Sequence, residues 1–320
     1  DSFYPYFKRL RREDPVHYCA DSPYGPYWSV TRYDDIMQVE LDHATYSSAA
    51  HLGGIALRDN PFGQDMANFI SMDPPGHTGQ RRTVAPIMAP KNLRNMEETI
   101  RQRTGDVLNS LPRGETFDWV DKVSTELTTM MLATLFDFPW EDRRMLTYWS
   151  DVATTDYGAP GALVHSDDER LDVLKEMGQY MGRLWKERGR NEGGFDLISM
   201  LSQAEATKDM NHMDLIANSV LLIVGGNDTT RNSMSGGLMA LCDNPDQFAA
   251  LRADHNLIKT LVPEIIRYQS AIIHMRRTAL RNTEFQGKSI KKGDRVVMWY
   301  VSDNWDDEFI DDPMAFKIDR

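Results

Sequence analysis

The spacing of apolar residues along the chain predicts a mostly helical protein. In several long stretches, apolar side chains recur about every 3.6 residues, as they do on one face of an α-helix. The first of these stretches carries Leu93, Met96, Ile100, Val107 and Leu108. We expect helices over residues 92–111, 120–135, 143–154, 169–187, 196–203, 213–242 and 257–268.

Alternating apolar and polar residues predict small β-sheets near both ends of the chain. Such alternation over a few residues is typical of strands that have one buried face. Strands are expected at residues 27–31, 278–280, 285–290 and 295–301, with turns at Gly287-Lys288 and Lys292-Gly293-Asp294. Residues 47–71, which contain Gly and Pro, predict a long loop, and long loops in compact domains are usually functional. The predicted fold class is mostly α with small β-sheets.

Composition and charge exclude several classes of protein. The 320 residues include 36 basic and 48 acidic side chains, for a net charge of -12, whereas nucleic-acid binding needs a basic surface. No apolar stretch approaches the length of a membrane span, and no secretory segment opens the chain. Two cysteines make a disulfide framework implausible, so we expect a cytoplasmic protein. The chain lacks an initial Met and stops within a pattern at 316–320, which predicts a fragment truncated at both ends.

The most informative motif is Gly225-Gly226-Asn227-Asp228-Thr229-Thr230, in the middle of the longest predicted helix. These residue types are all unfavourable inside helices. One interpretation is therefore two helices, with Gly225 ending the first and Asp228 capping the second. The other is one long helix that is locally deformed. There the glycines would admit a flat ligand, and a Thr hydroxyl released from the backbone would hold water.

Three further motifs are weak individually. Glu264 and Arg267 are three residues apart on a predicted helix and can form an ion pair, which on a surface contributes little. His77 and Arg81 are spaced to share one face of a helix, where they could bind a carboxylate or simply be solvated. An arginine pair at 276–277 on a predicted strand could also bind a carboxylate, or could protect the edge of a sheet from pairing with another strand.

The order and spacing of these motifs resemble the cytochrome P450 family. The similarity includes Asp73-Pro74-Pro75 with His77 and Arg81 downstream, the acid-Thr helix, Glu-x-x-Arg about 35 residues later and Arg-x-Ala on a strand. It runs from the first residues to the final Phe316-Lys317-Ile318-Asp319-Arg320. The resemblance implies one cytochrome P450 domain over residues 1–320, incomplete at its C-terminus, and a haem-thiolate monooxygenase.

The resemblance also implies a cofactor, haem b (iron-protoporphyrin IX), and the residues that bind it. His77, Arg81 and Arg277 would contact the haem propionates. Gly225 and Gly226 would let the long helix lie over the haem face.

Other site residues follow from the same resemblance. Asp228 and Thr229 would be catalytic, managing the water chain that delivers protons to dioxygen. Glu264 and Arg267 would be structural, locking the core beneath the haem.

Two departures from the family pattern affect these expectations. Trp305 stands where the family usually has Arg, which puts a local ion-pair network in question. The Cys that ligates the iron is expected beyond Arg320, so the chain itself carries no metal ligand. Cys19 and Cys242 lack the glycine-rich loop of that ligand, and we interpret both as buried or incidental thiols. We therefore expect the full-length gene product to be a monooxygenase and this chain alone to be inactive.

A small apolar substrate is expected, because the segments predicted to line the pocket are apolar. These segments are the 47–71 loop, Leu221, Leu222, Val224, Ile272 and Ile273. The stretches 224–237, 273–279 and 297–300 resemble bacterial P450 alkane hydroxylases, which oxidise the terminal carbon of medium-chain alkanes. The resemblance implies O2 and electrons from a ferredoxin with its NADH-dependent reductase. A fatty-acid or sterol side-chain hydroxylase is the near alternative.

The motifs of two other enzyme classes are incomplete or absent. Gly287-Lys288-Ser289 is like the end of a phosphate-binding loop, but position 282 is Asn where that loop needs Gly. The chain has no Gly-x-Ser-x-Gly motif of a serine hydrolase. The remaining rival is non-enzymatic, a helical binding module or a degenerate haem protein.

Overall fold

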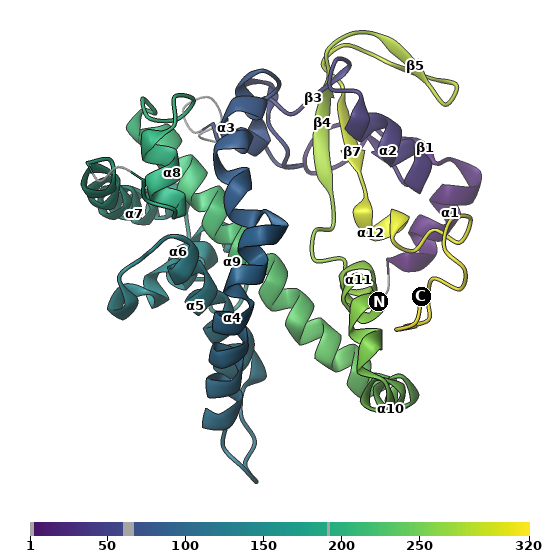
Figure 1. Ribbon diagram of the computed structural model, residues 1–320. Coiled ribbons are helices and arrows are strands. Elements are labelled where there is room, and N and C mark those ends of the chain that lie inside the picture. The colour runs from purple at the N-terminus through teal and green to yellow at the C-terminus, as the bar shows by residue number, and fades with distance from the viewer. Residues whose placement is uncertain (1–2, 60–66, 191–192) are drawn as a thin grey trace. The chain divides into compact units, whose positions relative to one another are not determined.

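The structure is a computed structural model that describes residues 3–59, 67–190 and 193–320 (Figure 1). Contacts divide the chain into two compact units. We call Asp1–Gln64, Ser71–Asp73 and Asn232–Arg320 the sheet unit, and Asp65–Ile70 with Pro74–Arg231 the helical unit. The division falls inside one long helix, α9. The single domain expected over residues 1–320 stays a prediction.

Amphipathic helices build the helical unit. Their bounds are α3 Gly76–Val84, α4 Pro90–Ser110, α5 Glu126–Leu135, α6 Arg144–Thr154, α7 Asp167–Arg188, α8 Leu197–Gln203 and the first part of α9 His212–Asp243. The 3-10 turns Phe69–Ser71, Ala85–Met88 and Trp140–Asp142 and the π-helical turn Val120–Thr125 complete it. Side-chain caps fix two starts, because Ser166 accepts a hydrogen bond from the Glu169 amide and Asp196 from the Ser199 amide.

Several helices of this unit bury an apolar face against a neighbour, whereas α4 buries only Val107 and leaves Leu93, Ile100 and Leu108 exposed. Helix α5 packs against α4 and α6, and α7 packs against α6 and α8 (Figure 1). The buried face of α7 carries Leu174, Met177, Met181 and Leu184, spaced by three or four residues. This agreement between period and burial explains why the pattern of apolar residues predicted these helices.

The sheet unit combines short helices with two small sheets. Its helices are α1 Tyr4–Glu13, α2 Tyr33–Leu41, α10 Pro245–Ala253, α11 Ile258–Gln269 and α12 Tyr300–Asp303, with 3-10 turns Ala50–Leu52 and His255–Leu257. Its strands are β1 Val16–Cys19, β2 Tyr27–Val30, β3 Tyr46–Ser47, β4 Met275–Ala279, β5 Thr283–Phe285, β6 Lys288–Ile290 and β7 Arg295–Met298.

The larger sheet has the strand order β1-β2-β7-β4-β3, and β5 pairs with β6 in a separate hairpin. Strands β2 and β7 pair in parallel, with Trp28 opposite Val296, and the other pairings among the described strands are antiparallel. Val16, Val30, Ile36, Val296 and Met298 belong to the core between this sheet and its neighbours, and each is at most 1% exposed. In the central strands β2 and β7, three consecutive residues are buried, so both faces of the sheet are covered there.

The predicted fold class is confirmed, and three local expectations are corrected. Helix α9 is unbroken from His212 to Asp243, so the two-helix interpretation of the glycine motif is wrong. The strand expected over 295–301 ends at Met298, and α12 begins at Tyr300. The hairpin turn lies at Gln286-Gly287, where both φ angles are positive, one residue earlier than expected.

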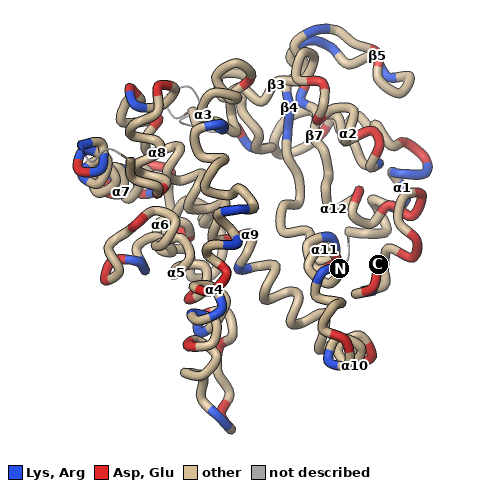
Figure 2. The backbone as a smooth tube through the Cα atoms, in the orientation of Figure 1, with Lys and Arg blue, Asp and Glu red and all other residues tan. Residues whose placement is uncertain are grey.

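Basic and acidic residues are mixed along several of the described helices. Figure 2 shows Lys and Arg interspersed with Asp and Glu along α4 and α7, for example. Within residues 3–59, 67–190 and 193–320, no helix combines the length and apolar character needed to cross a membrane.

Candidate functional site

The centre of α9 presents an open patch of backbone beside a hydroxyl group. A Cβ placed on Gly225 would meet no atom within 4 Å, apart from its own helix backbone and chain neighbours. One turn later, the Thr229 hydroxyl donates a hydrogen bond to the Gly225 carbonyl oxygen at 2.9 Å. The hydroxyl therefore bonds within the helix, rather than being released from the backbone as expected. The patch can still admit a flat group close to the helix axis.

The next residue, Gly226, serves a different neighbour. A Cβ there would lie 2.6 Å from Leu132 Cδ2 on α5, closer than atoms can approach. Beside it, Asn227 is fully buried and bonds to the Thr128 hydroxyl on α5 at 2.7 Å. Gly226 thus allows α9 and α5 to pack closely, and the open space belongs to Gly225 alone.

Asp228 lies in a network of charged side chains that the sequence motif did not reveal. The Arg231 guanidinium donates to the Asp228 carboxylate at 2.6 Å and to Asp151 of α6 at 2.8 Å. The Ser150 hydroxyl lies 3.4 Å from the same Asp228 oxygen. The three-residue spacing of Asp228 and Arg231 was visible in the sequence, whereas Asp151 comes close only through the packing of α6 on α9.

His77 and Arg81 share one face of α3, as their spacing predicted. His77 is half-buried and Arg81 is exposed. In the part of the chain that the structure describes, Arg81 makes no ion pair with an acidic side chain. An exposed, unpaired guanidinium is available to bind an anionic group.

In the sheet unit, Glu264 and Arg267 form a buried bidentate ion pair rather than a surface pair. The two N–O distances are 2.7 and 2.8 Å. Arg267 also donates to three backbone carbonyl groups, those of Asn304, Pro313 and Ala315. This pair organises the segment after α12, which supports a structural role.

Sequence reasoning missed a third member of this cluster. Arg320 Nε lies 3.2 Å from Glu264 Oε2, and the Lys317 amide donates to Glu264 Oε1 at 2.9 Å. Arg320 was quoted only as the end of a pattern. Its partner lies 56 residues earlier, so no local spacing indicated the contact.

The arginine pair of β4 divides between the two faces of the sheet, because successive strand residues point to opposite sides. Arg277 binds Glu40 of α2 at 2.6 Å. Arg276 is 3% exposed and binds Asp59 at 2.6 Å and the Leu52 carbonyl at 2.9 Å. Arg277 therefore already has a carboxylate partner within its own unit.

The residues expected to line a substrate pocket fall in both units. Leu221, Leu222 and Val224 of α9 are half-buried in the helical unit. Ile272 and Ile273 lie before β4 in the sheet unit and are 43% and 50% exposed. Exposed apolar side chains on this scale are consistent with a surface that contacts an apolar group.

Trp305, the departure from the family pattern, lies in an aromatic cluster. It is 5% exposed, with its ring centroid 4.2 Å from that of Tyr4 and 5.2 Å from that of Tyr268. Its carbonyl accepts a hydrogen bond from Arg11. The Glu264 ion pair is complete despite the change, so the network does not need an arginine at this position.

The titratable groups beside β4 and α12 are shifted by burial. Burial lowers the pKa of His274, whose ring centroid lies 5.0 Å from that of Trp299. The pKa of Asp303 is raised to about 7, chiefly by burial. Cys19 is half-buried and Cys242 is exposed, so of the two descriptions given for these thiols, buried or incidental, the first does not fit Cys242. In the described residues, no group of three or more His, Cys, Asp or Glu side chains is arranged to hold a metal ion.

Comparisons with known proteins agree with this arrangement. A profile of the family described as Cytochrome P450 matches residues 167–320. Linalool 8-monooxygenase of Pseudomonas putida is 35% identical over 98% of this chain and 79% of its own length. Putative cytochrome P450 126 of Mycobacterium tuberculosis is 34% identical over 97% of this chain and 77% of its own.

Solved structures give closer matches. Cytochrome P450-153 from Novosphingobium aromaticivorans is 46% identical with a TM-score of 0.92, covering 100% of this chain and 80% of that one. CYP153D17 from Sphingomonas sp. PAMC 26605 is 47% identical with a TM-score of 0.87, covering 98% and 78%. With relatives this similar over nearly its whole length, the chain belongs to the cytochrome P450 family of monooxygenases.

Proposed function

We propose that the protein hydroxylates an aliphatic substrate, the terminal carbon of medium-chain alkanes, using O2 and electrons from a ferredoxin and its NADH-dependent reductase. The observation that carries this proposal is the composition of α9. Three half-buried apolar residues, Leu221, Leu222 and Val224, come directly before the open patch at Gly225 and Thr229. The 46% and 47% identity to two CYP153 structures supports the same substrate class.

Cytochrome P450 proteins bind haem b, and several side chains of this chain fit that cofactor. The open surface at Gly225 suits a flat ring system, and the unpaired Arg81 guanidinium, with His77 on the same face, suits the propionates. When bound, the haem supplies the redox chemistry of oxygen insertion. We propose that Arg277 also contacts a propionate. To do so, its guanidinium must bind Glu40 and the propionate together, or give up the ion pair with Glu40. For Gly226 we propose only an indirect role in haem binding. It lets α9 pack closely against α5.

Asp228 and Thr229 are the proposed proton-handling pair. The Arg231 guanidinium holds the Asp228 carboxylate beside α6, and Thr229 offers a hydroxyl one residue further along the helix. In this role Asp228 would take up a proton from solvent when its carboxylate leaves Arg231 and pass it to the Thr229 hydroxyl, which would release its own proton onward. Glu264 and Arg267 act structurally, through the carbonyl groups that Arg267 binds.

The first test is product analysis with the full-length gene product, loaded with haem and supplied with ferredoxin, reductase and NADH. Octane is expected to give mainly 1-octanol. The exchange Ile273→Phe should change the ratio of 1-octanol to 2-octanol, because Ile273 is proposed to contact substrate. The matched control is Ile266→Phe, an isoleucine of α11 outside the proposed set that is 56% exposed, against 50% for Ile273. Failure to turn over octane would refute the alkane proposal.

A second candidate is a sterol side-chain hydroxylase. Proteins named Steroid C26-monooxygenase in Mycobacterium tuberculosis are 29% identical over 98% of this chain. Turnover of cholest-4-en-3-one or decanoate in preference to octane would favour this candidate or a fatty-acid hydroxylase.

The proton-handling roles have their own test. The exchange Thr229→Ala should lower the product formed per NADH consumed while the carbon-monoxide difference spectrum stays unchanged. The neighbouring Thr230→Ala, at an exposed position, should leave both quantities unchanged. Equal effects of the two substitutions would contradict the role of Thr229.

A further inference from the structure

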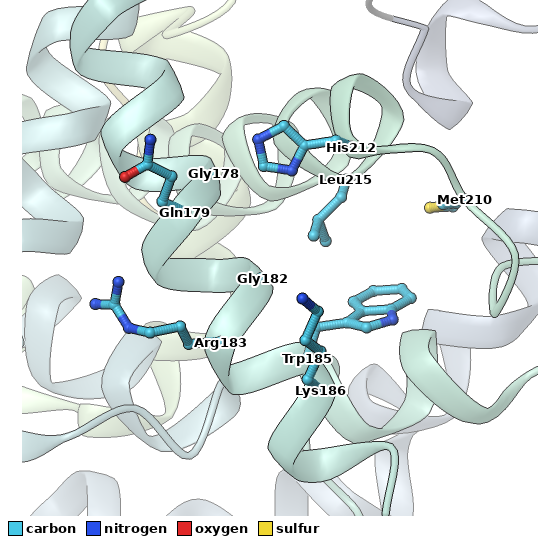
Figure 3. A pocket seen from close by; sticks show the side chains of 9 residues that line it. All are labelled: Gly178, Gln179, Gly182, Arg183, Trp185, Lys186, Met210, His212 and Leu215. Atoms are coloured by element: carbon cyan, nitrogen blue, oxygen red, sulfur yellow. The ribbon is translucent and has the colours of Figure 1, made fainter.

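A concave site lies in the helical unit, between α7 and the start of α9. It encloses about 590 Å³ (Figure 3). Nine residues line it: Gly178, Gln179, Gly182, Arg183, Trp185 and Lys186 of α7, and Met210, His212 and Leu215. We call it the α7 cleft. None of these residues belongs to the proposed haem, proton-handling or substrate set.

Two glycines one turn apart shape the cleft. A Cβ on Gly178 would lie 2.4 Å from Ile216 Cγ1, so this glycine lets the start of α9 approach α7. A Cβ on Gly182 would meet nothing within 4 Å, again leaving aside its own helix backbone and chain neighbours. Gly178 therefore lets α7 and the start of α9 pack closely, and Gly182 leaves the open space of the cleft between them.

The polar groups at the cleft favour an anion. Arg183, Lys186 and His212 line it, and none of its nine lining residues is Asp or Glu. Elsewhere on α7, Lys175 pairs with Asp172 and Arg188 with Asp137. Among the residues that the structure describes, Arg183 and Lys186 have no such carboxylate partner. Unpaired cations in a cleft concentrate negative ligands, even in a chain with a net charge of -12.

The remaining lining is apolar. Figure 3 shows the Leu215 side chain pointing toward Trp185, with the Lys186 amine near the indole and the His212 ring on the opposite wall. Leu215 is buried and Trp185 half-buried. A ligand in this space would contact an indole and an aliphatic side chain, with the Lys186 amine on one side and the His212 ring on the other.

We propose that the α7 cleft binds a free amphipathic carboxylate of medium chain length. Its carboxylate lies between Lys186 and His212, and its hydrocarbon chain lies along Trp185 and Leu215. This proposal does not rest on the alkane hydroxylase function, because it uses no residue of that site. It would stand if the substrate proved to be a sterol.

The test uses 11-bromoundecanoate, whose bromine quenches indole fluorescence at short range, with the full-length protein. The Trp185 contribution is the quenching that disappears in Trp185→Phe, which separates the cleft from any binding elsewhere. We expect that contribution to saturate with probe concentration. Gly182→Leu fills the hollow and should weaken binding at least about tenfold. Lys186→Gln should weaken it about fivefold.

Two matched controls should bind as the unmodified protein does. Gly105→Leu alters a glycine of α4 whose Cβ position is also open, and Lys175→Gln removes a cation of α7 outside the cleft. Unchanged Trp185 quenching in Gly182→Leu would overturn the proposal. So would equal affinity for the neutral 11-bromoundecanol, which decides the matter even if Gly182→Leu fails to fold. Quenching by brominated phosphatidylglycerol vesicles but not by the monomeric probe would replace the free carboxylate with a lipid surface and overturn the proposal.

Discussion

The adjacent glycines of α9 should respond to the same substitution with opposite signs. Replacing glycine by alanine inside a helix stabilises the folded state by roughly 0.5–1 kcal/mol, because the unfolded chain loses conformational freedom. At Gly225 the new methyl group meets open space. Gly225→Ala should therefore raise the free energy of unfolding of the apoprotein by about that amount.

At Gly226 the same methyl group would lie 2.6 Å from Leu132 Cδ2, and Leu132 is only 2% exposed. Restoring ordinary contact requires a buried side chain to move by about 1 Å, and such overpacking costs about 1–3 kcal/mol. After subtraction of the helix gain, Gly226→Ala should destabilise the apoprotein by roughly 0.5–2 kcal/mol. The two variants should thus differ by about 1–3 kcal/mol.

Urea unfolding of the full-length apoprotein measures both values, provided that the slope of free energy against urea is unchanged. Shortening the obstructing side chain provides the internal control. Leu132→Val should cost less in the Gly226→Ala background than in the original protein, and this coupling should be absent with Gly225→Ala. If Gly226→Ala stabilised the protein as Gly225→Ala does, the close packing of α9 on α5 and the assignment of the open space to Gly225 alone would both be wrong.

Three further predictions concern the charged clusters. Arg267→Lys should destabilise the protein by about 3–5 kcal/mol in chemical unfolding, because it leaves a buried carboxylate poorly paired. The control Arg9→Lys, in an exposed pair, should leave the stability unchanged. The pKa of Asp303 is about 7 in the folded protein against an ordinary 3.8, so its contribution to stability is complete below pH 4 and lost as pH rises toward 7. This loss amounts to up to roughly 4 kcal/mol. In Asp303→Asn the free energy of unfolding should depend less on pH between about 4 and 7. An unchanged pH dependence in this variant would contradict the burial argument. Arg231→Gln should lower the free energy of unfolding by about 1–3 kcal/mol, because Asp228 and Asp151 lose their shared cation. Arg231→Lys, which keeps the charge, should recover part of this loss. An unchanged melting temperature for Arg231→Gln would show that the network is solvated.

The sequence predicted elements where one period persisted over several turns. Helices α4, α6, α7 and α9 begin and end within two residues of their expected bounds, because each has apolar residues at helical spacing towards both ends. Helices α1, α2 and α10 were not predicted. Each has nine or ten residues, so its apolar pattern covers too few turns to stand out.

Site contacts were predictable only where both partners lie within one turn of a helix. Glu264 with Arg267 and Asp228 with Arg231 are of this kind. The contacts of Arg320 with Glu264 and of Asp151 with Arg231 join residues more than 50 positions apart, and tertiary packing alone creates them. The α7 cleft belongs to the same class, since its hollow depends on how closely the start of α9 approaches Gly178.

The hydrogen bonds of Arg267 have a consequence for sequence variation. Residues 304–320 contain no helix or strand, yet this one guanidinium binds carbonyl oxygens of residues 304, 313 and 315. Every amino acid presents the same carbonyl group, so Arg267 recognises the path of the backbone and not the identity of the side chains. Substitutions at these three positions should therefore be tolerated as long as the path is kept, while Arg267 itself has no equivalent replacement.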